Sequence, residues 1–547
     1  MIRKYLGLFC TAAFVSFFCT ASPPATPKLV ITLVVDQMRP DLLTRFDNLY
    51  TGGFRWLMDH GIWFTNTHHE HSYTATGPGH TAIGFGQYPG KIGMLGNSWY
   101  DRSLKKNVNC VEDPNAKVVG SSKGKARSFA RYNTFGLGDW MKTEYPSSKV
   151  ISIGGKDRAA CILGGKDRAA CILGGKQPNL PLYYNRAGSF ISSDYYVDEL
   201  PDWAAMFNQN LQADSYKDSI WVKSLSDNLY LEYAREDHYP GEVDDYLMDE
   251  YSPVFPIGID AGADPTAAFM GFPWFEREVL NLAKEAINGE ALGKGDHSDL
   301  LFIGFSAMDW MIHDYGPHSQ EVMDACIKLD RYMGNFMEFV DKTLGLENVM
   351  FVLTADHGGL PLPEYLVEKG GAGGRINQKH LAEAIEWIDE ECEERFGKKL
   401  YHREGGNFYL NHERLKKANL KPERIYEIVE KYLTNVDGVE KVIIKDDVLN
   451  STQQDKMTLR IKKMIHPDNS PEIFPLVTPG FLYRNPYGTS HGSPYDYDTH
   501  VPLIFARSHF KSQEDTSPRA TVDIAPTIAK YLDVNIPEYC DGSPIDL

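Results

Sequence analysis

The sequence predicts an α/β fold: an α/β/α sandwich around a mostly parallel sheet, with an inserted α+β subdomain. Several apolar runs have the length and character of strands buried on both faces. They alternate with segments of helical periodicity, such as the apolar stripe along residues 319–340. Strand–helix–strand alternation is typical of a parallel sheet with helices on both faces. The expected strands lie at residues 28–35, 61–66, 148–154, 299–306, 349–354 and 501–506.

The chain changes character between residues 372 and 480, where charged helical stretches alternate with short strands. We interpret this segment as the inserted subdomain, and residues 22–371 and 481–547 as the main domain. Residues 180–297 are rich in Tyr, Trp, Asp and Pro and show no clear periodicity. We expect them to form loops and short elements over one end of the sheet.

The N-terminus has the features of a signal peptide. Arg3 and Lys4 precede a short apolar run, and small residues lead up to Ser22. A basic start, a short apolar stretch and a small-residue cleavage site predict a signal peptide over residues 1–21. The apolar run is short for a membrane span, and no other run is long enough. We therefore expect an exported protein, periplasmic or secreted, with no stable membrane span.

The overall charge excludes some functions. The formal net charge is −18, and charged residues make up 24% of the chain. A protein that binds nucleic acid through a general basic surface would carry the opposite charge, so we expect no nucleic-acid partner. An anionic substrate is still compatible with this charge, because metal ions and a few cations can reverse the local field in a cleft.

Carboxylates follow three of the expected strands, at the point where each strand ends. Asp36 follows the first strand, Asp309 the fourth and Asp356 the fifth. Each alone could be a helix cap or a turn residue. Ligands in open α/β sheets, however, bind at the carboxyl ends of the strands. The three together therefore indicate a binding site at this edge of the sheet.

Three histidines accompany these carboxylates. His313 lies four residues after the fourth-strand aspartate, which places both on one side of a helical turn. His357 directly follows the fifth-strand aspartate, and His491 lies in a Gly/Ser-rich stretch before the last strand. Three carboxylates and three imidazoles form the donor set of two N/O-coordinated divalent ions, and zinc fits this set best.

Thr76 is the candidate nucleophile. It lies in a Gly/Pro-rich turn that leads into an expected helix. A hydroxyl at a helix N-terminus beside a metal can be deprotonated and attack phosphorus, and the backbone N–H groups there favour an anion. A Thr in this position can also be a plain N-cap, and Thr74 is a competing hydroxyl.

Lys156 and Arg158 follow the third expected strand. The lysine ammonium is a compact positive charge, and the arginine guanidinium offers several N–H donors in one plane. Together they suit a dianionic phosphoryl group. Asn97, which follows a glycine, can donate an amide hydrogen bond to a phosphoryl oxygen. Without the other residues, a turn would be the default interpretation of this asparagine.

A perfect repeat makes the assignment of these cations ambiguous. Residues 154–163 recur without change at 164–173, so Lys166 and Arg168 repeat the same pair. Two short copies do not make a repeat architecture, and we interpret the second as a local insertion. The first pair is preferred because it directly follows the strand at 150–153.

These residues, in this order, resemble the alkaline phosphatase superfamily. The similarity is greatest to its monomeric bacterial phosphomonoesterase branch with a Thr nucleophile, which is related to the nucleotide pyrophosphatase/phosphodiesterases. The motifs that carry it are residues 34–37, residues 355–358 and residues 523–527. The resemblance implies a monomeric two-zinc alkaline phosphatase that hydrolyses small phosphate monoesters through a phospho-threonine intermediate.

The resemblance also implies a role for each site residue. Asn97, Lys156 and Arg158 would bind the non-bridging oxygens, and the Lys-x-Arg pair favours monoesters over diesters. Two alternatives are a phosphodiesterase or phosphonate hydrolase of the same superfamily, and a catalytically impaired binding homologue disabled by the duplication. The implied zinc ligands are Asp309, His313 and His491 for one ion, and Asp36, Asp356, His357 and the Thr76 oxygen for the other.

Overall fold

The protein is described here by a computed structural model. The described residues are 26–166, 179–243, 254–259, 262–484 and 486–547. The predicted signal peptide lies outside these residues, and so does most of the second copy of the repeat. Within the described ranges, no helix combines the length and the apolar character that a membrane crossing requires.

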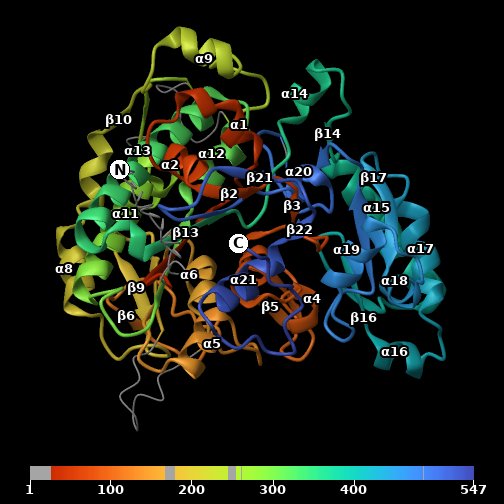
Figure 1. Ribbon diagram of the computed structural model, residues 1–547. Coiled ribbons are helices and arrows are strands. Elements are labelled where there is room, and N and C mark those ends of the chain that lie inside the picture. The colour runs from red at the N-terminus through yellow and green to blue at the C-terminus, as the bar shows by residue number, and fades with distance from the viewer. Residues whose placement is uncertain (1–25, 167–178, 244–253, 260–261, 485) are drawn as a thin grey trace, which may run out of the picture.

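Ten strands of the described chain form one large sheet (Figure 1). Its centre consists of five parallel strands, each paired with the next. Val34 pairs with Gly304 on one side and with Thr354 on the other, so neighbouring strands end at nearly the same level. In spatial order, the central strands are β13 (Val349–Thr354), β1 (Leu29–Val35), β12 (Asp299–Phe305), β7 (Val150–Gly154) and β8 (Leu180–Tyr184).

Antiparallel strands extend the sheet on both sides. On one side β20 (Leu503–Ala506) pairs antiparallel with β13, and β2 (Gly61–Phe64) pairs antiparallel with β20. On the other side β9 (Phe190–Ser193) pairs antiparallel with β8. The edge strands are β21 (Gln513–Asp515) and β6 (Val118–Val119). The sheet is thus mostly parallel, as the sequence predicts.

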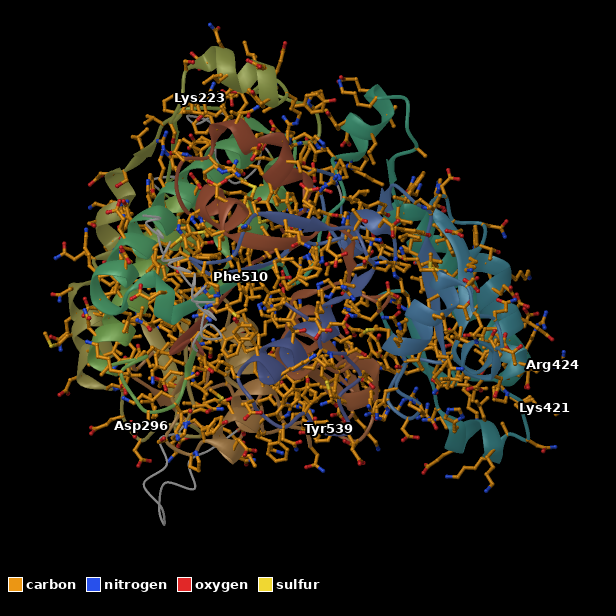
Figure 2. The ribbon with its side chains drawn as sticks, viewed as in Figure 1. Lys223, Asp296, Lys421, Arg424, Phe510 and Tyr539 are labelled. Carbon is orange, nitrogen blue, oxygen red and sulfur yellow. The ribbon has the colours of Figure 1, made fainter. Side chains whose placement is uncertain are left out.

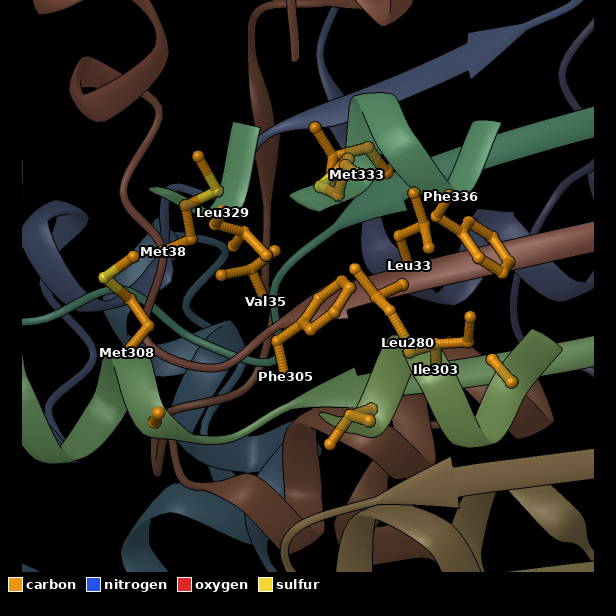
Figure 3. Close-up of a cluster of buried hydrophobic side chains, with 14 of the residues drawn as sticks. Leu33, Val35, Met38, Leu280, Ile303, Phe305, Met308, Leu329, Met333 and Phe336 are labelled. Carbon is orange, nitrogen blue, oxygen red and sulfur yellow. The ribbon is translucent and has the colours of Figure 1, made fainter. Parts of the chain in front are cut away.

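One face of the sheet is covered by α2 (Gly53–Asp59), α11 (Pro273–Gly289), α12 (Ala307–Tyr315) and α13 (Gln320–Leu344). Alternate side chains of β1 and β12, including Leu33 and Phe305, point into this layer (Figure 3). They meet Leu280 of α11 and Met333 and Phe336 of α13. The side-chain period of two along a strand sends the intervening residues to the opposite face.

The opposite face is covered by α3 (Thr76–Phe85), α5 (Leu137–Glu144), α6 (Asp157–Gly164) and α21 (Ile524–Tyr531). Val30 and Val34 of β1 pack there among apolar side chains from all four helices. Helices on both faces of one sheet confirm the predicted α/β/α sandwich.

The prediction for residues 180–297 was wrong. This segment supplies two strands of the main sheet, β8 and β9, and the 17-residue helix α11. Pro181 lies inside β8, where it argues against a central strand because proline has no N–H to donate. Helix α11 begins with Pro273 at its first position, a site that tolerates proline because no helical hydrogen bond is needed from that nitrogen.

Residues 374–482 contain a second, four-stranded sheet, which lies beside the first (Figure 1). Its strands pack against α15 (Gln378–Phe396) and α17 (Glu423–Leu433), and the unit has its own apolar core. Figure 2 shows Lys421 and Arg424 on its outer edge. The predicted domain limits, residues 372 and 480, stay a prediction. The strands of this sheet are β15 (Tyr401–Glu404), β16 (Asn407–Leu410), β18 (Ile473–Val477) and β17 (Val439–Ile444).

Candidate active and metal site

Four neighbouring strands deliver polar side chains to one edge of the sheet. Asp36 directly follows β1, and Asp356 follows β13 after one residue. Asp309 lies in the first turn of α12, which begins two residues after β12. Lys156 lies two residues beyond β7 and immediately precedes α6. Because the strands end level, these four side chains converge at the edge where α/β sheets bind ligands.

Asp309, His313 and His491 form one group of potential metal ligands. His313 Nε2 lies 3.4 Å from Asp309 Oδ1, and His491 Nε2 lies 3.8 Å from the same oxygen. The four-residue spacing on α12 brings the first two side chains together, as predicted, and the loop before β20 supplies the third.

Asp36, Asp309 and His357 form a second such group, so Asp309 belongs to both. His357 Nε2 lies 3.5 Å from Asp36 Oδ1 and 3.6 Å from Asp356 Oδ2. The rings of His357 and His491 stack with their centroids 3.7 Å apart. The two groups are therefore neighbours, and all six predicted carboxylate and imidazole ligands lie at one place.

Backbone carbonyls orient all three imidazoles in the same way. In each ring Nδ1 contacts a carbonyl oxygen at hydrogen-bond distance, so Nδ1 carries the proton and Nε2 keeps its lone pair. Each Nε2 is the atom that faces the carboxylates. The carbonyl partners are Thr489 at 2.8 Å for His313, Thr74 at 2.7 Å for His491 and Gly358 at 2.9 Å for His357.

Burial and mutual repulsion shape the ionisation of the carboxylates. Burial raises the pKa of Asp36, and the negative charges of Asp309 and Asp356 raise it further, more than the Lys156 ammonium lowers it. Burial also raises the pKa of Asp309, but Lys156 and the nearby imidazoles outweigh it and leave that pKa well below its usual range. Three buried carboxylates beside a single ammonium form a strongly negative site that suits divalent cations.

Several polar atoms at this site are buried without a hydrogen-bond partner among the described residues. They belong to the second metal group, to its neighbour Asp356 and to the candidate nucleophile. A buried polar atom without a partner costs free energy, so a set of them facing one place indicates a missing ligand. The residues present therefore fit a bound divalent metal. The atoms are Asp36 Oδ1, Thr76 Oγ1, Asp356 Oδ2 and His357 Nε2.

Thr76 is the first residue of α3, and its side chain is 1% exposed. The N-cap is Ala75, so the Thr76 hydroxyl does not serve as a cap, and it makes no hydrogen bond to a described residue. The competing hydroxyl, Thr74 Oγ1, donates to the Ser493 carbonyl oxygen at 2.9 Å. A side chain at Gly79 would place its Cβ 1.9 Å from the Asp356 carbonyl oxygen, so only glycine lets α3 start this close to β13.

Each of the three predicted phosphoryl-binding residues interacts with the start of α3 or with the carboxylates of the site. Asn97 Oδ1 accepts from Gly77 N at 2.8 Å, which directs the Asn97 amide to the start of α3. Lys156 Nζ lies 2.6 Å from Asp36 Oδ2 and 2.5 Å from Asp309 Oδ2. Arg158 is the second residue of α6, and Asp36 and Asp309 are among the charges that raise its pKa although burial lowers it.

The second copy of the repeat occupies a different place. Lys166 follows the end of α6, and its Nζ donates to the Tyr132 carbonyl oxygen at 2.7 Å. Its backbone N donates to Asp139 Oδ1 at 3.0 Å. Arg168 lies outside the described residues. Of the two lysines, only Lys156 contacts the carboxylates of the site.

Sequence reasoning missed two residues that contact this constellation. Gln37 has a left-handed backbone (φ 65°), donates its N–H to Asp356 Oδ1 at 3.2 Å, and has its side-chain amide oriented so that Nε2 donates to Asp309 Oδ1 at 2.8 Å. Glu276 of α11 is buried and accepts the N–H of Ala307, the first residue of α12. A lone glutamate on the apolar face of a helix is a signal that could have identified it.

Comparisons with known proteins agree with this geometry. Residues 30–500 match the family described as type I phosphodiesterase / nucleotide pyrophosphatase. The alkaline phosphatase PafA of Elizabethkingia meningoseptica is 29% identical over 533 residues, which are 95% of this chain and 94% of that protein. The alkaline phosphatase PhoV of Synechococcus elongatus is 30% identical over 526 residues, 95% of this chain and 92% of that protein.

The crystal structure of wild-type alkaline phosphatase PafA superposes on the present structure with a TM-score of 0.86. The two chains are 28% identical, and the match covers 96% of this chain and 99% of that one. Sequence and fold thus agree over nearly the whole length. The chain belongs to the type I phosphodiesterase / nucleotide pyrophosphatase family of the alkaline phosphatase superfamily, and it is similar to PafA-type alkaline phosphatases.

Proposed function

We propose that the protein is an alkaline phosphatase that hydrolyses phosphate monoesters through a phospho-threonine intermediate on Thr76. The observation that carries the proposal is the Thr76 hydroxyl, which is buried at the start of α3 and has no hydrogen-bond partner among the described residues, near two groups of potential metal ligands. Two relatives with near-complete coverage, PafA and PhoV, are alkaline phosphatases, which supports the same reaction class.

The donor set supports two zinc ions per chain. Asp309, His313 and His491 would hold one, and Asp36, Asp356, His357 and the Thr76 oxygen would hold the other. Imidazole nitrogens and carboxylate oxygens are the ligands that zinc uses in catalytic sites. When bound, the two ions supply Lewis-acid stabilisation of the attacking and leaving oxygens.

The residues of the chain would perform the rest of the reaction. Thr76 Oγ gives up its proton to water and forms a bond to phosphorus, while the bond to the leaving alcohol breaks on the opposite side and the departing oxygen takes up a proton from water. Asn97, Lys156 and Arg158 neutralise and orient the non-bridging oxygens. The N–H groups at the start of α3 favour the transferred phosphoryl group, because a helix N-terminus carries partial positive charge. Water then cleaves the phospho-threonine and restores the hydroxyl.

A phosphodiesterase is the second candidate, because the matching family is described by that activity. Both activities would use the same metal site. The Lys156 and Arg158 cations favour the monoester, since a monoester brings two negative charges and a diester only one. We expect kcat/KM for phenyl phosphate to exceed that for bis-phenyl phosphate. The opposite order would replace the monoesterase assignment with a diesterase.

Substitution of the nucleophile tests the proposal directly. Thr76→Ala should lower kcat by a factor on the order of 10⁴ and abolish the covalent phosphoenzyme, because no oxygen remains to attack phosphorus. Thr76→Ser should retain both in part. Thr74→Ala is the matched control and should still form the phosphoenzyme. A phosphoenzyme in Thr76→Ala, detected by mass spectrometry after acid quench, would identify a different nucleophile.

Metal content, oligomeric state and export complete the proposal. Elemental analysis of the purified protein should give two zinc ions per chain, and chelation should remove the activity. Light scattering should give the mass of a monomer.

We also propose that residues 1–21 direct export to the periplasm or the medium. Mass spectrometry of the exported protein should then find an N-terminus at Ser22, and an uncut N-terminus would contradict this.

A further inference from the structure

A groove of about 1020 Å³ lies beside the site, between the main sheet and the second sheet. The second sheet and its helices contribute Leu381 and Ile385 of α15, Tyr409 of β16 and Phe474 of β18. Tyr483 follows β19 (Phe481–Leu482) and completes this wall. The groove is far larger than a phosphoryl group needs, and no step of the reaction proposed above uses it.

The groove is continuous with the site through Tyr73 and His491, which both line it. A Cβ placed on Gly96 or on Gly492 would lie 3.1 Å from the Tyr73 ring, so the ring lies close to both glycines. Gly96 precedes Asn97 and Gly492 follows His491. The Tyr73 ring therefore lies between the phosphoryl-binding amide and a metal ligand, where the site opens into the groove.

The direction of the reaction connects the groove to the substrate. In an in-line displacement the leaving oxygen departs on the side of phosphorus opposite the attacking Thr76 oxygen. Thr76 lies on the side of the proposed metal site of Asp36, Asp356 and His357. The leaving oxygen would therefore face the other proposed metal site, formed by Asp309, His313 and His491. Since His491 also lines the groove, the alcohol attached to the leaving oxygen extends into it.

We propose that this groove is the leaving-group subsite and that it selects monoesters of uncharged aromatic or apolar alcohols. This inference rests on the proposed phosphatase function. Its walls are aromatic and aliphatic side chains, which gain free energy by covering an apolar group. The inserted segment thus acts as a specificity element for a reaction carried out by the main sheet.

The charges in the groove favour an uncharged leaving group over an anionic one. Glu386, Asp389 and Glu404 line it, and Arg403 is a cation among them. Asp389 Oδ2 lies 2.6 Å from Lys399 Nζ, so this ion pair cancels its charge. Glu386 and Glu404 form no ion pair with a described residue. A second anionic group on the substrate would meet net negative charge there.

The test compares phenyl phosphate with 2-naphthyl phosphate. Their phenols have similar acidity, so the chemical step is similar and the added ring reports on the groove. We expect the wild-type protein to favour the naphthyl ester in kcat/KM by roughly tenfold, mainly through KM, because a bound ring adds favourable contacts. Tyr483→Ala should reduce this preference by roughly fivefold, and Tyr483→Phe should keep it.

Tyr487→Ala is the matched control. Tyr487 is 38% exposed, as is Tyr483, lies four residues further along the chain, and does not line the groove. Its substitution should leave the naphthyl preference unchanged. A phosphate ester of a sulfonated naphthol should lose the preference in the wild-type protein, because the sulfonate would meet the acidic side chains.

Turnover and binding separate the two proposals. Hydrolysis of phenyl phosphate with equal naphthyl preference in the wild type and in Tyr483→Ala would overturn the subsite and leave the phosphatase intact. Failure to hydrolyse either ester would overturn the phosphatase. Calorimetry with benzylphosphonate and 2-naphthylmethylphosphonate, which lack a cleavable ester, then still tests whether the groove binds the aromatic group. Tighter binding of the naphthyl compound that depends on Tyr483 supports the subsite. Equal binding of the two compounds overturns it.

Discussion

The same three residues, Gly-Gly-Lys, stand at 154–156 and again at 164–166, and their surroundings differ completely. At the first position the chain leaves β7, and Lys156 Nζ lies between two carboxylates at 2.6 Å and 2.5 Å. At the second position the chain leaves α6, and Lys166 Nζ donates to the Tyr132 carbonyl oxygen. One lysine lies at the active site, and the other holds a loop.

The preceding segment makes the difference. Val150–Gly154 is a fully buried strand in the middle of a parallel sheet, so whatever follows it emerges at the ligand-binding edge. Asp157–Gly164 is an amphipathic helix packed on one face of the sheet. It ends at Gly164, because the next residue, Gly165, has a φ of 76° that does not continue a helix. The environment of each lysine is thus set by the strand or helix that precedes it.

The largest expected effect separates the two lysines. Lys156→Ala should lower kcat/KM for phenyl phosphate roughly 100-fold, because charge-assisted hydrogen bonds of about 1.5–3 kcal/mol to the phosphoryl oxygens are lost. Lys166→Ala should change it by less than about twofold, since its ammonium bonds a backbone carbonyl away from the carboxylates. Steady-state kinetics of both purified variants measures the contrast.

The charge of the substrate sharpens this prediction. A diester carries one negative charge fewer, so Lys156→Ala should cost less with bis-phenyl phosphate than with the monoester. Equal losses on both esters would show that Lys156 orders the carboxylates rather than binding substrate. Equal activities of Lys156→Ala and Lys166→Ala would contradict the assignment of the first copy to the site.

A smaller effect is expected on the free energy of unfolding when the carboxylate that holds the start of the second copy is removed. The buried Asp139 carboxylate accepts from Gly136 N at 2.8 Å, Lys166 N at 3.0 Å and Asn179 Nδ2 at 3.2 Å. Asp139→Ala leaves these donors unpaired, so the free energy of unfolding should fall by about 2 kcal/mol while kcat per folded molecule is kept. Denaturant unfolding measures the loss.

The control for Asp139→Ala is Asp341→Ala, which removes one hydrogen bond to Leu346 N at an exposed position. It should cost less than about 0.5 kcal/mol. If Asp139→Ala lost its turnover but not its stability, the end of α6 would belong to the active site and the comparison between the two copies would fail.

The comparison also explains which parts of the molecule could be predicted from sequence. Strand ends are visible in sequence, because a long apolar run stops at a polar residue, and Asp36 and Asp356 were identified in this way. Six strands of the ten-stranded sheet were predicted from such runs, whereas β8, β9, β6 and β21 were not. The order in which the strands lie was not predicted, since no local pattern states which strands pair.

Other features were missed because their local pattern was misleading or did not show their partner. β8 carries a proline where a central strand normally has none, so its role in the sheet was missed. Glu276 stands out as a lone glutamate on an apolar helix face, but its partner Ala307 lies 18 residues after the end of α11, and only the packing of α11 on the sheet brings the two together. Whether Asn97 and Arg158 bind a phosphoryl group stays a prediction.

The smallest expected effect comes from deleting residues 164–173. The deletion joins Leu163 to another Gly-Gly-Lys at 174–176, so the sequence at the end of α6 is regenerated. We expect kcat/KM within about twofold of the wild type and a change in unfolding free energy below about 1 kcal/mol, because the entropy of closing the connection between α6 and β8 changes only slowly with its length. Because the two copies are identical, deleting either one gives the same chain, with a single Lys-Asp-Arg directly after β7. A large loss of activity with unchanged folding would therefore mean that one copy is not enough for function. A gain would mean that the insertion restrains α6, and with it Arg158.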